Sequence, residues 1–316
     1  MKPAELWRWE SMLVAVLIGE FVVFSALSPY FLSVETLSDA TFNFTERAIV
    51  ALPLALLIIA GEIDISVAAI IALASVAMGL ASAAGVGTPG IATVGLGTGL
   101  LAGCINGALV TLGRVPSIVA TIGTMTLFRG AAYAVLGDRV LKDYPESFAA
   151  FGQGYVAGPV SIELVLFMLF ALSFGVFLHR TRWGRTVFAI GANPVASRFA
   201  GVAVNRYRFA LFALTGMFSG LAAVLLTSRL GSTRPSIAQG WELEIISMVI
   251  LGGVSVWGGK GSIVGVVLAA LVFGLVTFGL GLMNIPGIVM SIFIGTLLIL
   301  VVAVPALLNK VPVNKK

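Results

Sequence analysis

The stretch Leu54-Ala-Leu-Leu-Ile-Ile-Ala-Gly-Glu-Ile-Asp-Ile-Ser66 decides the fold, because it places two carboxylates between two apolar runs. Ionised side chains are rare and costly at membrane depth. A short apolar run that ends at glycine and carboxylates, followed at once by a long apolar run, therefore indicates a helix that breaks within or at the edge of a bilayer. The stretch Ile246-Ser-Met-Val-Ile-Leu-Gly-Gly-Val-Ser-Val-Trp-Gly-Gly-Lys-Gly-Ser262 repeats this order of short helix, break and long helix.

The composition around these breaks indicates a polytopic membrane protein. The chain has 316 residues, of which 59% are hydrophobic and 10% charged, and its mean hydropathy is +1.08. Soluble domains are typically about half apolar and about a quarter charged. At about 20 residues per span, we expect one all-α transmembrane domain over residues 1–316, a bundle of about ten helices with short broken ones among them. The expected apolar segments are 12–28, 48–60, 65–84, 91–112, 117–136, 160–178, 209–228, 245–257, 261–282 and 286–308.

The distribution of basic residues predicts the orientation. The loop 179–208 carries six arginines and no carboxylate, and such loops lie in the cytoplasm. Counting crossings from it puts Arg114 and both termini in the cytoplasm and the loop 138–146 outside. The basic tail agrees; it contains Lys310, Lys315 and Lys316. We read the net charge of +5 as this loop bias, and not as a sign of a nucleic-acid partner.

Both broken segments run in the same direction on this count. Parallel repeats of that kind are common in transporters, so the sequence favours two pseudo-symmetric halves. A chance likeness between two glycine-containing hairpins is the alternative.

The first break contains Glu62, Asp64 and Ser66. Asp64 or Ser66 is expected to cap the helix that begins near residue 67 and to form part of a gate. Alternatively, the break lies at the cytoplasmic surface, or the carboxylates couple transport to an ion. Asn106 and Asn284, near or within apolar spans, either contact a hydroxylated solute or join helices.

The cytoplasmic loop predicts a short helix outside the membrane. Asn193 is a good N-cap, Pro194 suits the first helical position, and Gly201 suits the stop. A helix of two turns is not stable alone, so we expect it to dock on a separate cytoplasmic protein. Packing on its own bundle or on lipid headgroups is the alternative.

We find no signature of covalent chemistry. The sequence 258–262 lacks the Lys-Ser or Lys-Thr pair and the preceding strand of a P-loop, so its glycines, Gly259 among them, are expected to permit a tight turn. No His or Cys accompanies His179, so no metal site is expected. We therefore expect no enzyme activity and no cofactor bound by this chain. Its lone Cys104 allows no intrachain disulfide.

Three stretches in order resemble ribose-type permease subunits of bacterial ABC sugar importers. They are Gly61-Glu-Ile-Asp-Ile-Ser66, the segment from Gly184 to Val202, and Val249-Ile-Leu-Gly-Gly253 followed by Gly258-Gly-Lys-Gly-Ser262. The resemblance covers roughly residues 40 to 305. One departure is Glu62, which stands where that family usually has glycine.

The resemblance implies a sugar-translocating permease in the bacterial inner membrane, driven by alternating access and multi-pass with both termini cytoplasmic. Its partners would be cytoplasmic ATPase subunits that hold ATP and Mg²⁺, a second permease in a homodimer or heterodimer, and a periplasmic solute-binding protein. The expected solutes include ribose, rhamnose and the sugar-like autoinducer-2. The implied ATPase-docking residues are Arg185, Asn193, Pro194, Ala196, Ser197, Ala200 and Gly201. The candidate pathway and gate residues are Glu62, Asp64, Ser66, Asn106, Gly259 and Asn284.

Three rival interpretations remain open at this point. They are an ion-coupled secondary transporter that uses Glu62 or Asp64, a membrane scaffold without transport activity, and an ABC permease for branched amino acids.

Overall fold

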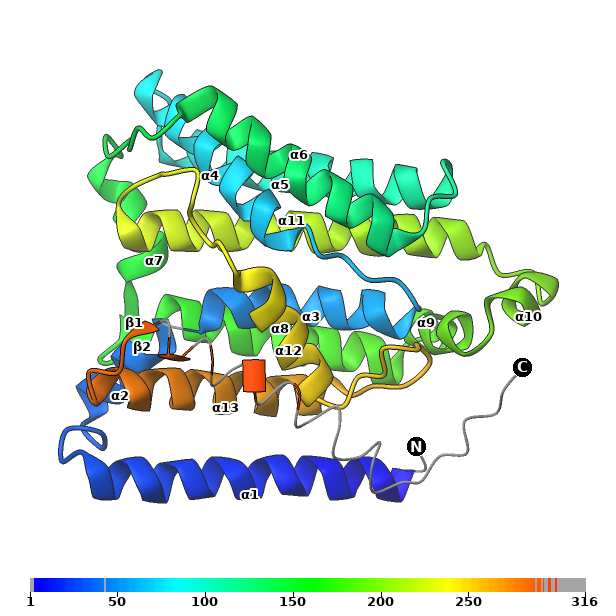
Figure 1. Cartoon of the computed structure of the whole chain (residues 1–316), viewed down its shortest axis with the longest axis horizontal. Coiled ribbons are helices and arrows are strands. Elements are labelled where there is room, and N and C mark those ends of the chain that lie inside the picture. Colours follow the sequence, from blue (N-terminus) through cyan, green and yellow to red (C-terminus); the bar gives the residue numbers. More distant parts are fainter. Residues whose placement is uncertain are drawn as a thin grey trace.

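The computed structural model describes residues 3–42 and 44–287, together with Val289, Met290, Ile292, Gly295, Thr296 and Ile299. Most of the expected last span, 286–308, and the basic tail lie outside these residues. The helices form a bundle in which most run along one long axis (Figure 1). They are α1 (Pro3–Leu27), α2 (Val34–Phe42), α3 (Thr45–Ile59), α4 (Val67–Ala83), α5 (Thr88–Thr111), α6 (Ser117–Leu136), the 3-10 turn η1 (Glu146–Ala149), α7 (Ala150–Gln153), α8 (Ile162–Arg180), α9 (Arg182–Ala192), α10 (Pro194–Phe199), α11 (Val204–Leu230), α12 (Trp241–Leu251) and α13 (Ile263–Leu282). Between α7 and α8, β1 (Tyr155–Ala157) and β2 (Val160–Ser161) form an antiparallel hairpin.

The bundle has two ends, named here after the helices that lie there. The α10 end carries α9, α10 and the start of α1, and the α2 end carries α2, α7 and the hairpin (Figure 1). Arg114 lines a pocket with Arg198 and Arg208 at the α10 end. The loop 138–146 lies at the α2 end, where the Ser82 hydroxyl donates to the Asp143 carbonyl. The predicted partition of these loops between opposite sides is therefore reproduced.

The expected number of crossings is not confirmed. Six of the described helices, α1, α5, α6, α8, α11 and α13, are long and apolar enough to span a bilayer, and α2 with α3 forms a seventh candidate bent by 50°. Helix α4 has 17 residues and α12 has 11. At 1.5 Å per residue, α12 extends only about 16 Å and reaches roughly halfway through a hydrocarbon core of about 30 Å.

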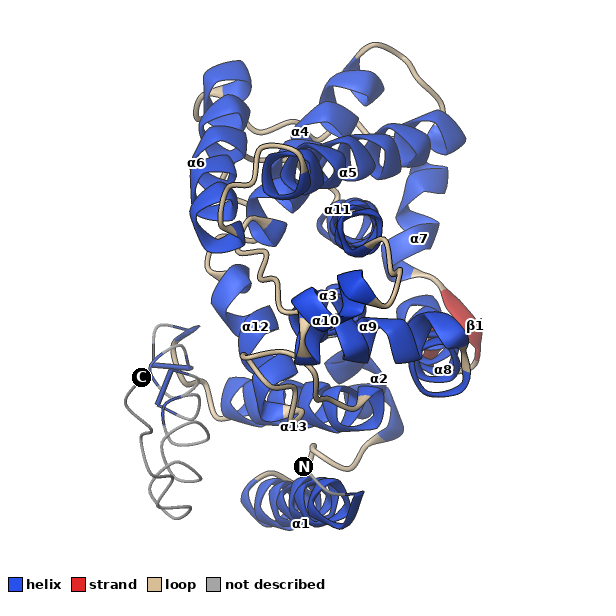
Figure 2. Cartoon of the chain, turned by 90° about the vertical axis from the view of Figure 1, so that its right-hand side faces the viewer, coloured by secondary structure: helices blue, strands red, loops and turns tan. Residues whose placement is uncertain are grey.

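Helix α3 forms the centre of the bundle. All 15 of its residues are buried, and it contacts α8, α11, α12 and α13. A helix that is hydrophobic all round has no polar face to present to water, so it is stable only when other helices surround it. Figure 2 shows this enclosure along the bundle axis.

Helices α5 and α11 pack with their backbones in close contact. A Cβ added to Gly99 would lie 2.3 Å from the Gly216 carbonyl oxygen, and one added to Gly216 would lie 2.3 Å from the Gly99 carbonyl oxygen. Only glycine at both positions permits this approach. The glycines of these spans therefore serve helix packing in lipid, as the sequence predicts.

The structure matches some predicted boundaries and adds one helix. Helix α6 covers 117–136 as expected, whereas α12 begins at Trp241 and ends at Leu251 instead of covering 245–257. Helix α9 was not predicted. Its apolar side chains Val187 and Ile190 are buried against the bundle, but the segment is too short and too basic to register as a span.

Candidate functional site

The first break folds into a buried polar cluster. Asp64 Oδ1 accepts hydrogen bonds from the Ser66 backbone N–H (2.8 Å) and from the Ser66 hydroxyl (2.7 Å). From α5, Asn106 Nδ2 donates to Asp64 Oδ2 (3.1 Å) and to Ser66 Oγ (2.7 Å). All three side chains are fully buried. The cluster therefore joins the start of α4 to α5, with Asp64 buried inside it although the break itself lies near the α10 end.

The capping prediction is correct only in part. Ser66 occupies the N-cap of α4, but its side chain makes no capping bond. Asp64 accepts a backbone N–H as predicted, although that N–H belongs to the N-cap residue and not to the first turn. The Asp64 carboxylate consequently fixes the backbone of the break at Ser66 and does not bond the free N–H groups in the first turn of α4.

Glu62 has a partner that is distant in sequence. Its Oε1 lies 2.8 Å from Arg208 Nη1, which comes from the first half of α11. The pair borders a pocket of about 550 Å³ at the α10 end, whose other charged side chains are Arg114 and Arg198. The extra carboxylate at position 62 thus ties the first break to α11 beside a basic, water-accessible pocket.

The second break meets the first at a junction of backbones. The Gly259 N–H donates to the Ile59 carbonyl at the end of α3 (2.8 Å). A Cβ added to Gly191 of α9 would lie 1.7 Å from that carbonyl oxygen and 2.4 Å from the Gly259 nitrogen. Both breaks and the end of α9 therefore touch at one point, named here the glycine junction and formed by Ile59, Gly191, Gly258 and Gly259.

The predicted docking residues lie next to this junction. Asn193 Oδ1 accepts from the Val195 and Ala196 N–H groups (3.1 and 2.9 Å), which caps α10 as predicted. Pro194 takes the first helical position, and Gly201, with φ of 83°, follows the last turn. Arg185, Ala196 and Ala200 are exposed, whereas Ser197 is buried and bonds the Asn193 carbonyl. The side chain of Phe199 is 90% exposed.

Asn284 does not join the other candidates. It follows α13 with a φ of 56°, and α13 ends against Phe24 near the α2 end. The structure thus brings together Glu62, Asp64, Ser66, Asn106 and Gly259 at one end of the bundle and leaves Asn284 at the other.

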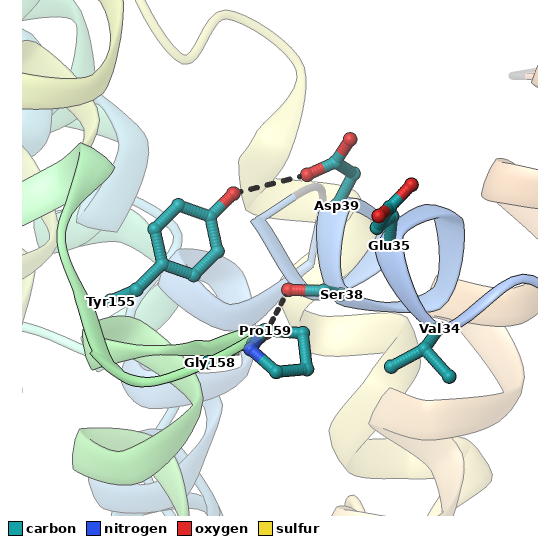
Figure 3. Close-up of a pocket in the computed structure, with 7 residues that line it drawn as sticks. All are labelled: Val34, Glu35, Ser38, Asp39, Tyr155, Gly158 and Pro159. Carbon is teal, nitrogen blue, oxygen red and sulfur yellow. Dashed lines mark hydrogen bonds between the residues drawn. The ribbon is translucent and has the colours of Figure 1, made fainter.

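The α2 end has a pocket of its own, shown in Figure 3. It measures about 480 Å³ and lies between α2 and the hairpin, with Glu35 and Asp39 on its rim. The Tyr155 hydroxyl donates to Asp39 Oδ1 (3.2 Å), and the Ser38 hydroxyl donates to the Pro159 carbonyl. These bonds attach the hairpin to α2.

A polar network behind this end was not predicted. Ser75 Oγ lies 2.8 Å from Thr227 Oγ1 and 2.9 Å from Thr233 Oγ1. The Tyr144 hydroxyl also bonds Thr233, and burial raises the pKa of Tyr144 to about 12, partly offset by that bond. Tyr144 therefore stays protonated at physiological pH and can donate to the network.

Sequence reasoning also missed charged side chains inside the bundle. Arg229 Nε donates to Glu46 Oε1 (2.7 Å), and Arg47 pairs with Glu244 and lies 4.9 Å from the Trp241 ring centroid. Arg129 on α6 donates to three backbone carbonyls. Arg129 stands alone in the middle of the apolar run 117–136. This position could have predicted a buried role, since such residues face the bundle interior or a water-filled path.

We expect Asp64→Asn to impair transport while leaving membrane insertion intact. The amide would keep one acceptor, but its NH2 would face the donating Asn106 amide, so at least one buried donor would lose its partner. An unsatisfied buried donor costs about 1–3 kcal/mol. Uptake by cells that contain equal amounts of wild-type and variant protein measures the effect, and Ser66→Ala removes one hydroxyl from the same cluster for comparison. Unchanged uptake in Asp64→Asn would show that charge at this position is dispensable.

The chain matches known proteins along nearly all of its length. A family model described as branched-chain amino acid transport system / permease component covers residues 37–302. The autoinducer 2 import system permease protein LsrD of Klebsiella pneumoniae is 38% identical over 301 residues, which is 93% of this chain and 90% of that protein. The proteins of the same name from Escherichia coli K12 and Shigella flexneri are 38% identical over 302 residues, 94% of this chain and 91% of each of them. No solved structure matches.

Proposed function

Because this chain belongs to the family of branched-chain amino acid transport system permease components, we propose that it is the membrane-spanning subunit of an ABC importer that carries autoinducer 2 or a closely related sugar-like solute. The observation that carries the proposal is the 38% identity to autoinducer 2 import permeases over more than nine-tenths of this chain. The family description alone would equally fit a permease for branched amino acids. The solute named for these relatives favours the sugar-like one.

Cytoplasmic ATPase subunits are the proposed energy source and the holders of ATP and Mg²⁺. In the described part of the chain, the element directly before the stretch 258–262 is helix α12 and not a strand, so the stretch does not have the strand–loop–helix context of a P-loop. The surface of α10, on which the side chains of Phe199 and Val195 are exposed, supports docking of a partner there. Apolar side chains on a short helix outside a bundle are typical of an interface core.

The further partners follow from the same proposal. A second permease would complete the pathway, and a periplasmic solute-binding protein would deliver the solute at the α2 end. The α10 end would face the cytoplasm across the bacterial inner membrane, with the start of α1 on that side. ATP binding and hydrolysis would drive alternating access, and this chain itself would carry out no covalent chemistry.

The contacts of the carboxylates disfavour the ion-coupled alternative. Glu62 is paired with Arg208, and Asp64 accepts three hydrogen bonds from Ser66 and Asn106. A coupling site needs a carboxylate that is free to take up a proton or cation and to release it. Both candidates instead already have protein partners that occupy their oxygens.

A pull-down and an uptake assay test this proposal together. The tagged protein, extracted from its native membranes in mild detergent, is expected to bring down a soluble P-loop ATPase, with or without a second permease. Uptake of autoinducer 2 is expected to stop on ATP depletion and to persist after a brief uncoupler treatment at maintained ATP. A preparation without ATPase, and uptake that instead collapses with the uncoupler, would overturn the proposal in favour of an ion-coupled carrier.

A further inference from the structure

A second cluster of polar side chains lies about halfway along α6, away from the first break. Here a cavity of about 390 Å³ lies between α6 and the chain that leads into α12. Figure 2 places these two helices on the same side of the bundle. The polar side chains that line the cavity are Thr126, Arg129, Tyr133, Gln239 and Glu242.

Arg129 builds one wall of this cavity. Its Nη1 donates to the carbonyls of Pro235 (2.7 Å) and Ile237 (2.8 Å), and its Nη2 donates to the Ala68 carbonyl (3.2 Å). These bonds hold the loop before α12 and the first turn of α4 against α6. The guanidinium is thus fixed in place, and the loop cannot move away without breaking charge-assisted hydrogen bonds.

The loop at the cavity holds an unusual backbone conformation. Ala238 has a φ of 56° and is buried, and it immediately precedes Gln239. Non-glycine residues rarely adopt the left-handed region, and where they do so the surrounding structure enforces it, often at ligand sites. The conformation directs the chain into α12 and leaves Gln239 exposed at the cavity.

These polar groups lie at a depth where lipid cannot solvate them. Helix α12 ends at the α10 end, where the Leu251 carbonyl accepts from Trp9, and its 11 residues place its start roughly 16 Å deeper. Thr126 and Gln239 are exposed and Glu242 is half-buried. Neither Gln239 nor Glu242 makes a side-chain hydrogen bond to any residue that the structure describes. The Glu242 carboxylate interacts electrostatically with the Arg129 guanidinium across the cavity, whereas the exposed Gln239 amide must face water or another protein chain.

The helix dipole accounts for only part of this arrangement. Glu242 lies in the first turn of α12, where a carboxylate is favoured by the positive helix end. The Thr126 hydroxyl donates to the Ile122 carbonyl of its own helix (3.2 Å). The helix dipole explains neither the exposed Gln239 amide nor the three hydrogen bonds by which Arg129 holds the cavity wall.

We propose that this cavity is a solute-contact site in a water-filled path through the importer, and that it takes a small polyhydroxylated solute. This inference rests on the proposed function. Solute hydroxyls donate to the Glu242 carboxylate and exchange hydrogen bonds with the Gln239 amide and the Tyr133 hydroxyl. Met125, which also lines the cavity, packs on the apolar face of the solute. Arg129 is a positioning residue that keeps the loop in place.

Cysteine labelling in the full importer tests the water-filled path. Cys104, the lone cysteine, is first replaced by alanine, and then Thr126→Cys, Gln239→Cys and Leu127→Cys are made separately. Leu127 is exposed on α6, is next to Thr126 and does not line the cavity. A membrane-impermeant sulfonated methanethiosulfonate is expected to react with Cys at 126 and 239 about tenfold or more faster than at 127. Equal rates at all three positions overturn the path.

Uptake and protection measurements test solute contact. Saturating autoinducer 2 is expected to slow labelling at 126 and 239. Glu242→Gln is expected to lower autoinducer 2 uptake about tenfold or more, the effect of losing one charge-assisted hydrogen bond, while ATPase co-purification stays normal. Normal uptake in Glu242→Gln with no protection from labelling overturns solute contact. If the wild-type importer binds no ATPase or carries no autoinducer 2, the proposed function fails separately, and the labelling rates still decide whether the path exists.

Discussion

Gly191→Ala is expected to abolish solute uptake in a protein that still inserts into the membrane. The added methyl group would lie 1.7 Å from the Ile59 carbonyl oxygen and 2.4 Å from the Gly259 nitrogen. Both neighbours are backbone, so no side chain can swing aside. The junction has to open, and the hydrogen bond from Gly259 to Ile59 has to lengthen or break. Overpacking of this kind costs about 1–3 kcal/mol, occasionally more.

The expected consequence is uncoupling, because α9 connects the docking helix to both breaks. The exposed surface of α10 is unchanged in this variant, so ATPase subunits should still co-purify while uptake falls about tenfold or more. Gly97→Ala is the matched control, since nothing lies within 4 Å of an added Cβ there and alanine suits a helix interior. Wild-type uptake in Gly191→Ala would show that the junction does not transmit motion.

Ala196→Arg is expected to release the ATPase and, as a result, to stop uptake. Ala196 is exposed on α10, and its backbone N–H is held by the Asn193 cap, so the long cationic side chain would project away from the bundle. At the core of a docking interface it would add bulk and an unpaired buried charge, which typically costs several kcal/mol of binding energy. Ala200→Arg, on the same exposed surface, is expected to behave in the same way.

The measurement is ATPase recovery in the pull-down, with membrane-inserted permease as the normaliser. Leu112→Arg serves as the control. Leu112 is exposed in the loop between α5 and α6, near Arg114. Arginine at this position adds the same charge at the α10 end but not on α10 itself. Full ATPase recovery with Ala196→Arg would contradict docking on this helix. Equal loss in the control would point to a general charge effect.

Local signals in the sequence were enough to predict α10. The cap, the proline and the glycine stop act within a few residues of one another, and each reappears in the structure. Long apolar runs were likewise enough for α6 and α13. Helix α9 was missed because its residues contact the end of α3 and the end of α8, and no property of its own segment reveals those contacts.

Pairings between distant helices explain the remaining differences. Asp64 and Asn106 were both singled out, but their hydrogen bond joins residues on separate elements and cannot be inferred from either segment. Arg208 was counted among the basic residues that set the orientation, although it also neutralises Glu62. The short helix α12 leaves the count of crossings unconfirmed, because hydropathy does not reveal that this helix begins partway through the bundle.

The enclosure of α3 has a consequence for how the chain is inserted during synthesis. The helices that surround it, α8, α11, α12 and α13, all emerge from the ribosome later than α3 itself. Arg229 and Glu244, which neutralise Glu46 and Arg47 at its start, also come later. A newly made α3 must therefore wait in lipid or within the translocon without these later ion-pair partners. Synthesis of the second half of the chain is thus the step that makes the first half stable in the membrane.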